Sequence, residues 1–161
     1  IRLFRDLTVL DNVLIGLHNE TKYSLATAMF RLPQYWRKER IAKERALELL
    51  SIFDMQDMAD HKAGSLPYGA QRRLEIVRAL ATNPCLLLLD EPTKGLDLES
   101  RRIIARALRD HAKAGGTVIM ATHDLDFAEQ VADDIAMMFD GEIACMEPPA
   151  DFFADNVFYR A

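Results

Sequence analysis

The sequence predicts an α/β fold in which an α-helical N-terminal part precedes a parallel β-sheet flanked by helices. Two observations support this prediction. Residues 64–161 alternate short apolar runs with amphipathic helical stretches, the pattern of strand–helix–strand units in a parallel sheet. Residues 1–63 have helical periodicity almost throughout and no strand-like alternation of any length. We therefore expect a helical subdomain over residues 1–63 and a sheet-containing part over residues 64–161.

The N-terminal part is expected to contain three helices. Thr8 can cap the first, whose apolar residues recur at helical spacing. The second covers about residues 24–31 and ends before Pro33, because a proline ring is incompatible with a helix interior. The third covers about residues 37–53, and its apolar stripe is expected to comprise Ile41, Ala46, Leu49, Leu50 and Phe53.

The C-terminal part is expected to begin with a helix and then to alternate strands and helices. The apolar run that ends at Asp90 is typical of a strand buried on both faces. Asp97 and Asp124 are suited to cap the two helices that follow, and Asp140–Gly141 is the strongest hairpin signal in the sequence. In chain order we expect a helix at about 70–81, a strand at 85–89, a helix at 98–113, a strand at 117–121, a helix at 125–132 and strands at 135–139 and 142–146.

Length and composition limit the classes of function. The chain has 161 residues, of which 50% are hydrophobic and 28% charged, so we expect one globular domain or one plus a small subdomain. A net charge of −5 argues against a uniformly basic nucleic-acid binder. The two cysteines form no disulfide framework, which favours a reducing compartment. No apolar run reaches the roughly 18 residues that a membrane helix needs.

Two acids follow the first expected strand, where ligands bind in parallel sheets. Asp90 is well placed there to hold Mg²⁺ against phosphate oxygens. Glu91 can orient or deprotonate an attacking water. Taken alone, however, the same residues fit an ordinary strand followed by a polar loop.

A glycine lies at the expected start of the helix at about 70–81. The backbone N–H groups around Gly69 could approach a phosphate, and the helix dipole favours an anion there. Arg72 and Arg73 are expected in the first helical turn, where the dipole disfavours cations and an anionic partner would offset the cost. A simple Pro–Gly turn leading into an ordinary helix is the alternative.

His123 ends the second strand of the expected sheet. A histidine at that edge can donate a hydrogen bond to a phosphate oxygen or polarise a water molecule. A surface histidine without a chemical role is the alternative. Asp97 likewise has two interpretations, because it could belong to the site or serve only as a helix cap.

The order and spacing of these signals resemble the nucleotide-binding subunits of ABC transporters over essentially the whole chain. The resemblance implies an α/β P-loop ATPase fold of the ABC cassette type, with residues 1–63 as its helical subdomain. Glu91 and His123 would be the catalytic base and the switch histidine, and Asp90 would hold Mg²⁺. The residues implied to contact ATP are the signature loop and the D-loop aspartate, namely Leu66, Pro67, Tyr68, Gly69, Ala70 and Asp97.

The sequence departs from the family pattern in two ways. It contains no GxxxxGK[ST] motif and begins at Ile1, so the resemblance implies a cassette that lacks its N-terminal third. Pro67 and Tyr68 stand where the commonest signature loops have Ser and Gly. One hydroxyl contact is lost by this change, whereas the Gly69 N–H remains.

The resemblance also implies a function. We expect the ATP-hydrolysing subunit of a bacterial importer, peripheral at the cytoplasmic face of the inner membrane. Its partners would be membrane permease subunits and a second ATP-binding subunit, as a homodimer or heterodimer, and not nucleic acid. Residues 3–13 and 66–76 resemble importers of branched-chain amino acids, so we expect that solute. Residues 90–97 and 148–159 resemble energy-coupling-factor importers of vitamins or metals. That alternative stays open, as does a catalytically inactive truncated fragment.

Overall fold

The computed structural model describes residues 2–18 and 33–155. The expected helix at about 24–31 lies outside these residues. The described part of the chain contains α1 (Val9–Leu17), α3 (Pro33–Ile52), the 3₁₀ turns η1 (Gln56–Met58) and η2 (Ala63–Ser65), α4 (Tyr68–Leu80), β1 (Leu86–Asp90), α5 (Leu98–Lys113), β2 (Thr117–Ala121), α6 (Leu125–Val131), β3 (Ile135–Phe139), β4 (Glu142–Glu147) and α7 (Pro149–Asp155).

Helix starts agree with the predicted caps. The side chain of Thr8 accepts a hydrogen bond from the Asp11 amide at 3.0 Å, and the Asp11 carboxylate accepts one from the Thr8 amide, which completes a capping box. Asp97 and Asp124 cap α5 and α6 as predicted.

None of the described helices combines the length and the apolar character needed to cross a membrane.

The buried face of α3 differs from the predicted apolar stripe at one residue. Ala46 and its partners toward the C-terminal end are buried as expected, but Ile41 is exposed. Ile41 precedes Ala46 by five residues, or about 140° around a helix, so it leaves the buried face. Ala42, four residues before Ala46, occupies that face instead.

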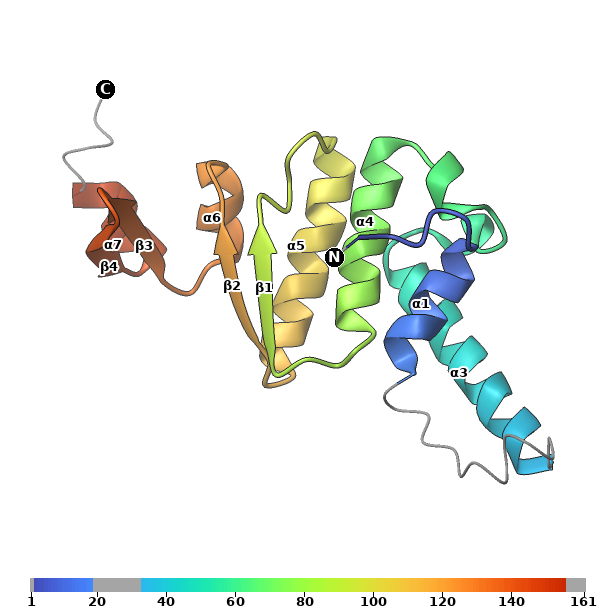
Figure 1. The fold of residues 1–161 in the computed structure, drawn as a ribbon. Coiled ribbons are helices and arrows are strands. Elements are labelled where there is room, and N and C mark those ends of the chain that lie inside the picture. Colours follow the sequence, from blue (N-terminus) through green and yellow to red (C-terminus); the bar gives the residue numbers. More distant parts are fainter. Residues whose placement is uncertain (1, 19–32, 156–161) are drawn as a thin grey trace.

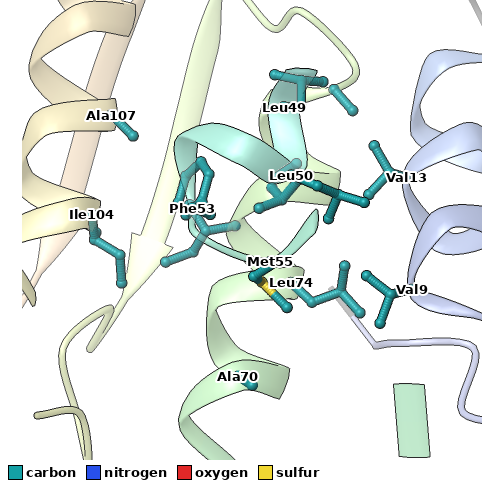
Figure 2. Close-up of a cluster of buried hydrophobic side chains, with 14 of the residues drawn as sticks. Val9, Val13, Leu49, Leu50, Phe53, Met55, Ala70, Leu74, Ile104 and Ala107 are labelled. Atoms are coloured by element: carbon teal, nitrogen blue, oxygen red, sulfur yellow. The ribbon is translucent and has the colours of Figure 1, made fainter. Parts of the chain in front are cut away.

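One continuous hydrophobic core joins the two parts of the chain. Helix α4 lies between α1 and α5, and its Leu74 is fully buried (Figure 1). Figure 2 shows that α1, α3, α4 and α5 all contribute side chains to this cluster. Val9, Leu50, Phe53 and Ile104 are among its fully buried members. The division of the chain at residue 64 stays a prediction.

Strands β1 and β2 pair in parallel, from Leu86 opposite Thr117 to Asp90 opposite Ala121. The prediction that β1 is buried on both faces is wrong, because only Leu87 on one face is buried and Leu88 on the other is exposed. The described helices cover only the first of these faces, where α5 lies beside the sheet (Figure 1).

Strand β3 does not extend this sheet, contrary to the expected strand–helix–strand pattern. Within the described residues it pairs only with β4, in an antiparallel hairpin. Asp140 and Gly141, with φ of 51° and 83°, form the tight turn that the sequence predicts. This turn brings β4 directly back along β3, so the local hairpin provides the pairing of β3.

Candidate functional site

The carboxyl ends of β1 and β2 bring Glu91 and His123 together, as the parallel register requires. The Glu91 amide donates to the Ala121 carbonyl at 2.8 Å. Oε1 of Glu91 accepts a hydrogen bond from the His123 amide at 3.1 Å and lies 3.7 Å from the His123 Nε2. The imidazole itself is fully exposed, whereas the Glu91 side chain is 27% exposed. One oxygen of Glu91 is therefore fixed, and the histidine ring faces solvent.

The backbone of Glu91 has a left-handed conformation, with φ of 46°. This region is unfavourable for residues with a Cβ, at a cost of about 1–3 kcal/mol that the surrounding structure must offset. Both peptide groups next to Glu91 are held in place, because its amide donates to Ala121 and its carbonyl accepts from the Lys94 amide at 3.2 Å. A strained residue of this kind is typical of functional sites.

An open pocket of about 440 Å³ lies at this end of the sheet. The side chains that line it are charged or polar, so they offer a ligand hydrogen bonds and ionic contacts. Its lining residues are Glu91, Thr93, Lys94, Arg101, His123 and Asp124. Lys94 and Arg101 contribute positive charge to the lining, and Glu91 and Asp124 contribute carboxylates.

A hydrogen-bond network beneath the pocket was not predicted from the sequence. Buried Thr93 donates its hydroxyl to Oδ2 of Asp124 at 2.9 Å. The same oxygen lies 2.8 Å from Nη1 of Arg101, whose Nε donates to the Leu96 carbonyl at 3.2 Å. Asp124 thus does more than cap α6, because it joins the loop after β1 to the loop after β2. Only its N-cap position was recognisable in the sequence.

Helix α4 begins at Tyr68, two residues before its predicted start. The first amides of a helix have no intrahelical acceptor, and Pro67, the N-cap residue of α4, offers them no side-chain acceptor either. Leu66 and Ala70 are buried in the core, whereas Tyr68 is 61% exposed. None of these residues lines the pocket of the same chain.

The earlier helix start also corrects the expectation for Arg72 and Arg73, which lie in the second turn. Arg72 Nη2 donates to the carbonyls of Asp90 and Glu91, at 2.5 and 3.2 Å. Arg73 Nη1 donates to the Phe53 carbonyl at 3.1 Å. Both guanidinium groups therefore bind carbonyl groups of the chain itself.

Residues around Gly95 contact the start of α4. Gly95 has φ of 72°, and a Cβ at this position would lie 2.9 Å from Cε1 of Tyr68. A Cβ added to Gly69 would lie 3.5 Å from Cδ2 of Leu96. Asp97 caps α5, and the hydrogen bond from the Ser100 amide to its Oδ1, 2.7 Å long, lowers the pKa of Asp97 below its ordinary value.

A family model described as ABC transporter matches residues 1–94. This chain belongs to the ABC transporter family. Two relatives are named as high-affinity branched-chain amino acid transport ATP-binding proteins. BraF of Pseudomonas aeruginosa is 33% identical over 145 residues, and LivG of Escherichia coli is 34% identical over 145 residues. Each match covers 88% of this chain and 56% of the relative, so the chain spans about half the length of the curated relatives it matches.

Solved structures of ATP-binding cassettes have the same fold. The dimeric cassette MJ0796 in a post-hydrolysis state, bound to ADP and Pi, has a TM-score of 0.74 and 30% identity, over 92% of this chain and 59% of that one. The cbiO1 cassette of Clostridium perfringens, part of a cbiONQ transporter complex, has a TM-score of 0.73 and 26% identity, over 96% and 55%. The predicted cassette fold and the resemblance to branched-chain amino acid transport proteins are confirmed.

The predicted site residues of the cassette lie in two separate places in this structure. The predicted catalytic base Glu91 and the predicted switch histidine His123 contact each other at the carboxyl-terminal edge of the sheet, and Asp90, predicted to hold Mg²⁺, ends β1 at the same edge. The predicted signature loop, residues 66–70, lies beside Gly95 and Leu96, and none of its residues lines the pocket. The roles of these residues stay predictions.

Proposed function

We propose that this chain provides the ATP-hydrolysing site of a solute importer, with branched-chain amino acids as the solute. The carboxylate of Glu91 supports this proposal most directly. It is held by the His123 amide at the mouth of a polar pocket, where an attacking water would need a base. The names of BraF and LivG support the choice of solute.

Three residues at this end of the sheet would carry the chemistry, of which Glu91 and His123 line the pocket and Asp90 is the last residue of β1. Glu91 accepts the proton of the attacking water or orients that water through its carboxylate. His123, with its exposed ring, donates a hydrogen bond to the terminal phosphate. Asp90 would hold Mg²⁺, an ion that would supply positive charge against the phosphates. A single carboxylate fits this ion, because Mg²⁺ keeps several waters and takes phosphate oxygens as further ligands.

The signature loop would act on nucleotide held by a second ATP-binding subunit. The unpaired amides at the start of α4, together with the helix dipole, form a site that favours an anion. Asp97 and Gly69 would lie near that nucleotide as well. Two subunits would enclose ATP between them and pass the closing motion to membrane permease subunits at the cytoplasmic face of the membrane.

An import experiment tests the solute. The N-terminal part of LivG, fused ahead of Ile1, supplies the phosphate-binding loop that the family resemblance implies, and we call this protein the LivG-completed cassette. We expect it to restore leucine uptake to E. coli cells that lack LivG. ATP hydrolysis without leucine uptake would contradict branched-chain amino acids as the solute and favour the alternative of a vitamin or metal importer.

A kinetic experiment tests the hydrolytic site. In the LivG-completed cassette, Glu91→Gln should keep ATP binding but lower turnover by at least about a hundredfold, because the amide cannot accept a proton from water. Unchanged turnover would remove Glu91 from the catalytic role. Loss of ATP binding together with turnover would show that the substitution disrupts the site as a whole.

A further inference from the structure

Arg72 reaches from α4 to the end of β1. Its Nη2 lies 2.5 Å from the Asp90 carbonyl oxygen and 3.2 Å from that of Glu91, so one nitrogen binds two successive carbonyls. The Asp90 carbonyl belongs to the peptide group before the Glu91 Cα and the Glu91 carbonyl to the one after it, so the two groups set the direction of the Glu91 side chain. In the described part of the chain, no other side chain donates a hydrogen bond to these two carbonyls.

The guanidinium is itself held in place. Its Nη1 lies 2.7 Å from Oε2 of Glu75, one turn further along α4, and both side chains are about three-quarters buried. The Nε of Arg72 is buried and has no hydrogen-bond partner within the described residues. The position of the Arg72 guanidinium is therefore fixed by the hydrogen bonds of its two terminal nitrogens.

The backbone of Glu91 needs support from outside its own loop. Its left-handed conformation is disfavoured, and a relaxed φ would turn the carboxylate away from the His123 amide that it binds at 3.1 Å. The amide bonds of Glu91 and Lys94 hold one side of this loop. Arg72 adds a side-chain contact to the Glu91 carbonyl, which also accepts from the Lys94 amide, and to the Asp90 carbonyl.

We propose that Arg72 is a positioning residue for the Glu91 carboxylate. Its guanidinium fixes the carbonyls of Asp90 and Glu91, and the carboxylate keeps its place at the pocket only while that contact exists. This inference rests on the proposed hydrolytic role of Glu91. Because Arg72 belongs to the helix that begins with the predicted signature loop, it also links that loop to the catalytic carboxylate of the same chain.

The chemistry of arginine fits this role better than that of lysine. A planar guanidinium can bind Glu75 with one nitrogen and two backbone carbonyls with the other, whereas an ammonium is a single point of charge on a flexible stem. Arg72→Lys therefore keeps the charge but loses the simultaneous contacts. Arg73→Gln is a matched control, because Arg73 is its neighbour and binds the Phe53 carbonyl, not the end of β1.

A double-mutant cycle in the LivG-completed cassette tests the proposal. Arg72→Lys and Arg72→Gln should lower kcat by about 10- to 100-fold, with KM for ATP changed less than about twofold, as for a displaced catalytic group. On a Glu91→Gln background the same substitutions should change the residual turnover less than about twofold, because the group that they position is already absent. Arg73→Gln should lower the melting temperature without this dependence on Glu91. Equal losses from Arg72→Lys on both backgrounds would overturn the proposal.

A measurement without ATP separates the contact from the catalytic role. The measurement is amide hydrogen exchange in the 161-residue chain. The Glu91 and Lys94 amides should exchange at least about tenfold faster in Arg72→Lys than in the unaltered chain. Arg73→Gln should leave the exchange rates of these two amides, relative to the rest of the chain, unchanged. Equal exchange in the two variants would overturn the proposal. If the LivG-completed cassette is inactive while this difference persists, the proposed function fails and the positioning contact is supported.

Discussion

Gly69→Ala separates a folding role of the signature glycine from a functional one. Gly69 lies in the first turn of α4, and its φ is not in the left-handed region. A Cβ there would meet only Cδ2 of Leu96 at 3.5 Å, an ordinary van der Waals distance. Neither the backbone nor the packing therefore requires glycine at this position.

The magnitude follows from helix propensity. Replacing glycine by alanine stabilises a helix interior by up to about 1 kcal/mol, and by less in the first turn. For a protein of this size 1 kcal/mol corresponds to about 2–4 °C. We expect the melting temperature of Gly69→Ala to be unchanged or slightly raised. The added Cβ should nevertheless obstruct the approach of a phosphate to the amides at the start of α4.

The assay is ATP-driven dimerisation of the LivG-completed cassette, measured by light scattering. A Glu91→Gln background should retain the closed dimer because hydrolysis is blocked. Gly69→Ala should weaken dimerisation by about tenfold or more, and Gly69→Asp should abolish it because it adds a charge of the same sign as phosphate. ATP binding by the monomer should be unaffected.

A second glycine provides the control for folding. A Cβ on Gly16 would lie 2.8 Å from the Arg78 carbonyl oxygen and 2.9 Å from the Ala81 Cβ, where α1 and α4 make close contact. This overlap should cost about 1–3 kcal/mol and outweigh the gain in helix propensity, so Gly16→Ala should melt at a lower temperature. If Gly69→Ala melts as low as Gly16→Ala, or if Gly69→Asp dimerises as well as the unaltered protein, Gly69 has no role in binding the second nucleotide.

Three further outcomes are expected. The 161-residue chain alone should hydrolyse ATP negligibly, because it contains no GxxxxGK[ST] loop, and steady turnover that Glu91→Gln abolishes would contradict this. Thr93→Val should lower the free energy of unfolding by about 1–3 kcal/mol through the lost hydrogen bond to the Asp124 carboxylate, whereas Thr93→Ser, which keeps the hydroxyl, should lower it less in urea titrations. The stability difference between the unaltered chain and Asp97→Ala should be present at neutral pH and shrink as the pH falls below 3.8. A carboxylate with a lowered pKa stabilises the fold only while it is charged. A stability difference independent of pH would show that the charge of Asp97 contributes nothing.

Helix bounds could be predicted from sequence where the signals are local. Thr8 and Asp97 cap helices through hydrogen bonds to amides three residues away, so the residues that decide the start lie next to each other in the chain. The pairing of Glu91 with His123 could be predicted for a related reason. Parallel strands end at one edge of a sheet, which places the residues after them together.

The positions that prediction missed depend on packing between distant elements. The apolar sequence of β1 does not indicate which face of the strand a helix covers. Leu88 is exposed although its neighbour Leu87 is buried. The contacts of Arg72 with Asp90 and of Thr93 with Asp124 join residues 18 and 31 positions apart. Such contacts follow from how helices pack on the sheet, so nothing in the local sequence marks them.

The packing of α4 on the loop after β1 bears on how two nucleotide sites would communicate. Tyr68 lies against Gly95, and Arg72 binds the carbonyls of Asp90 and Glu91, so the start of the helix and the end of the strand are connected at two points. In the proposed dimer the start of α4 serves the nucleotide of the partner, and Glu91 serves the nucleotide of its own chain. A shift of α4 when it binds phosphate would therefore displace the carbonyls beside Glu91. Binding at one site would in this way alter the position of the base at the other, with no contact needed between the two nucleotides.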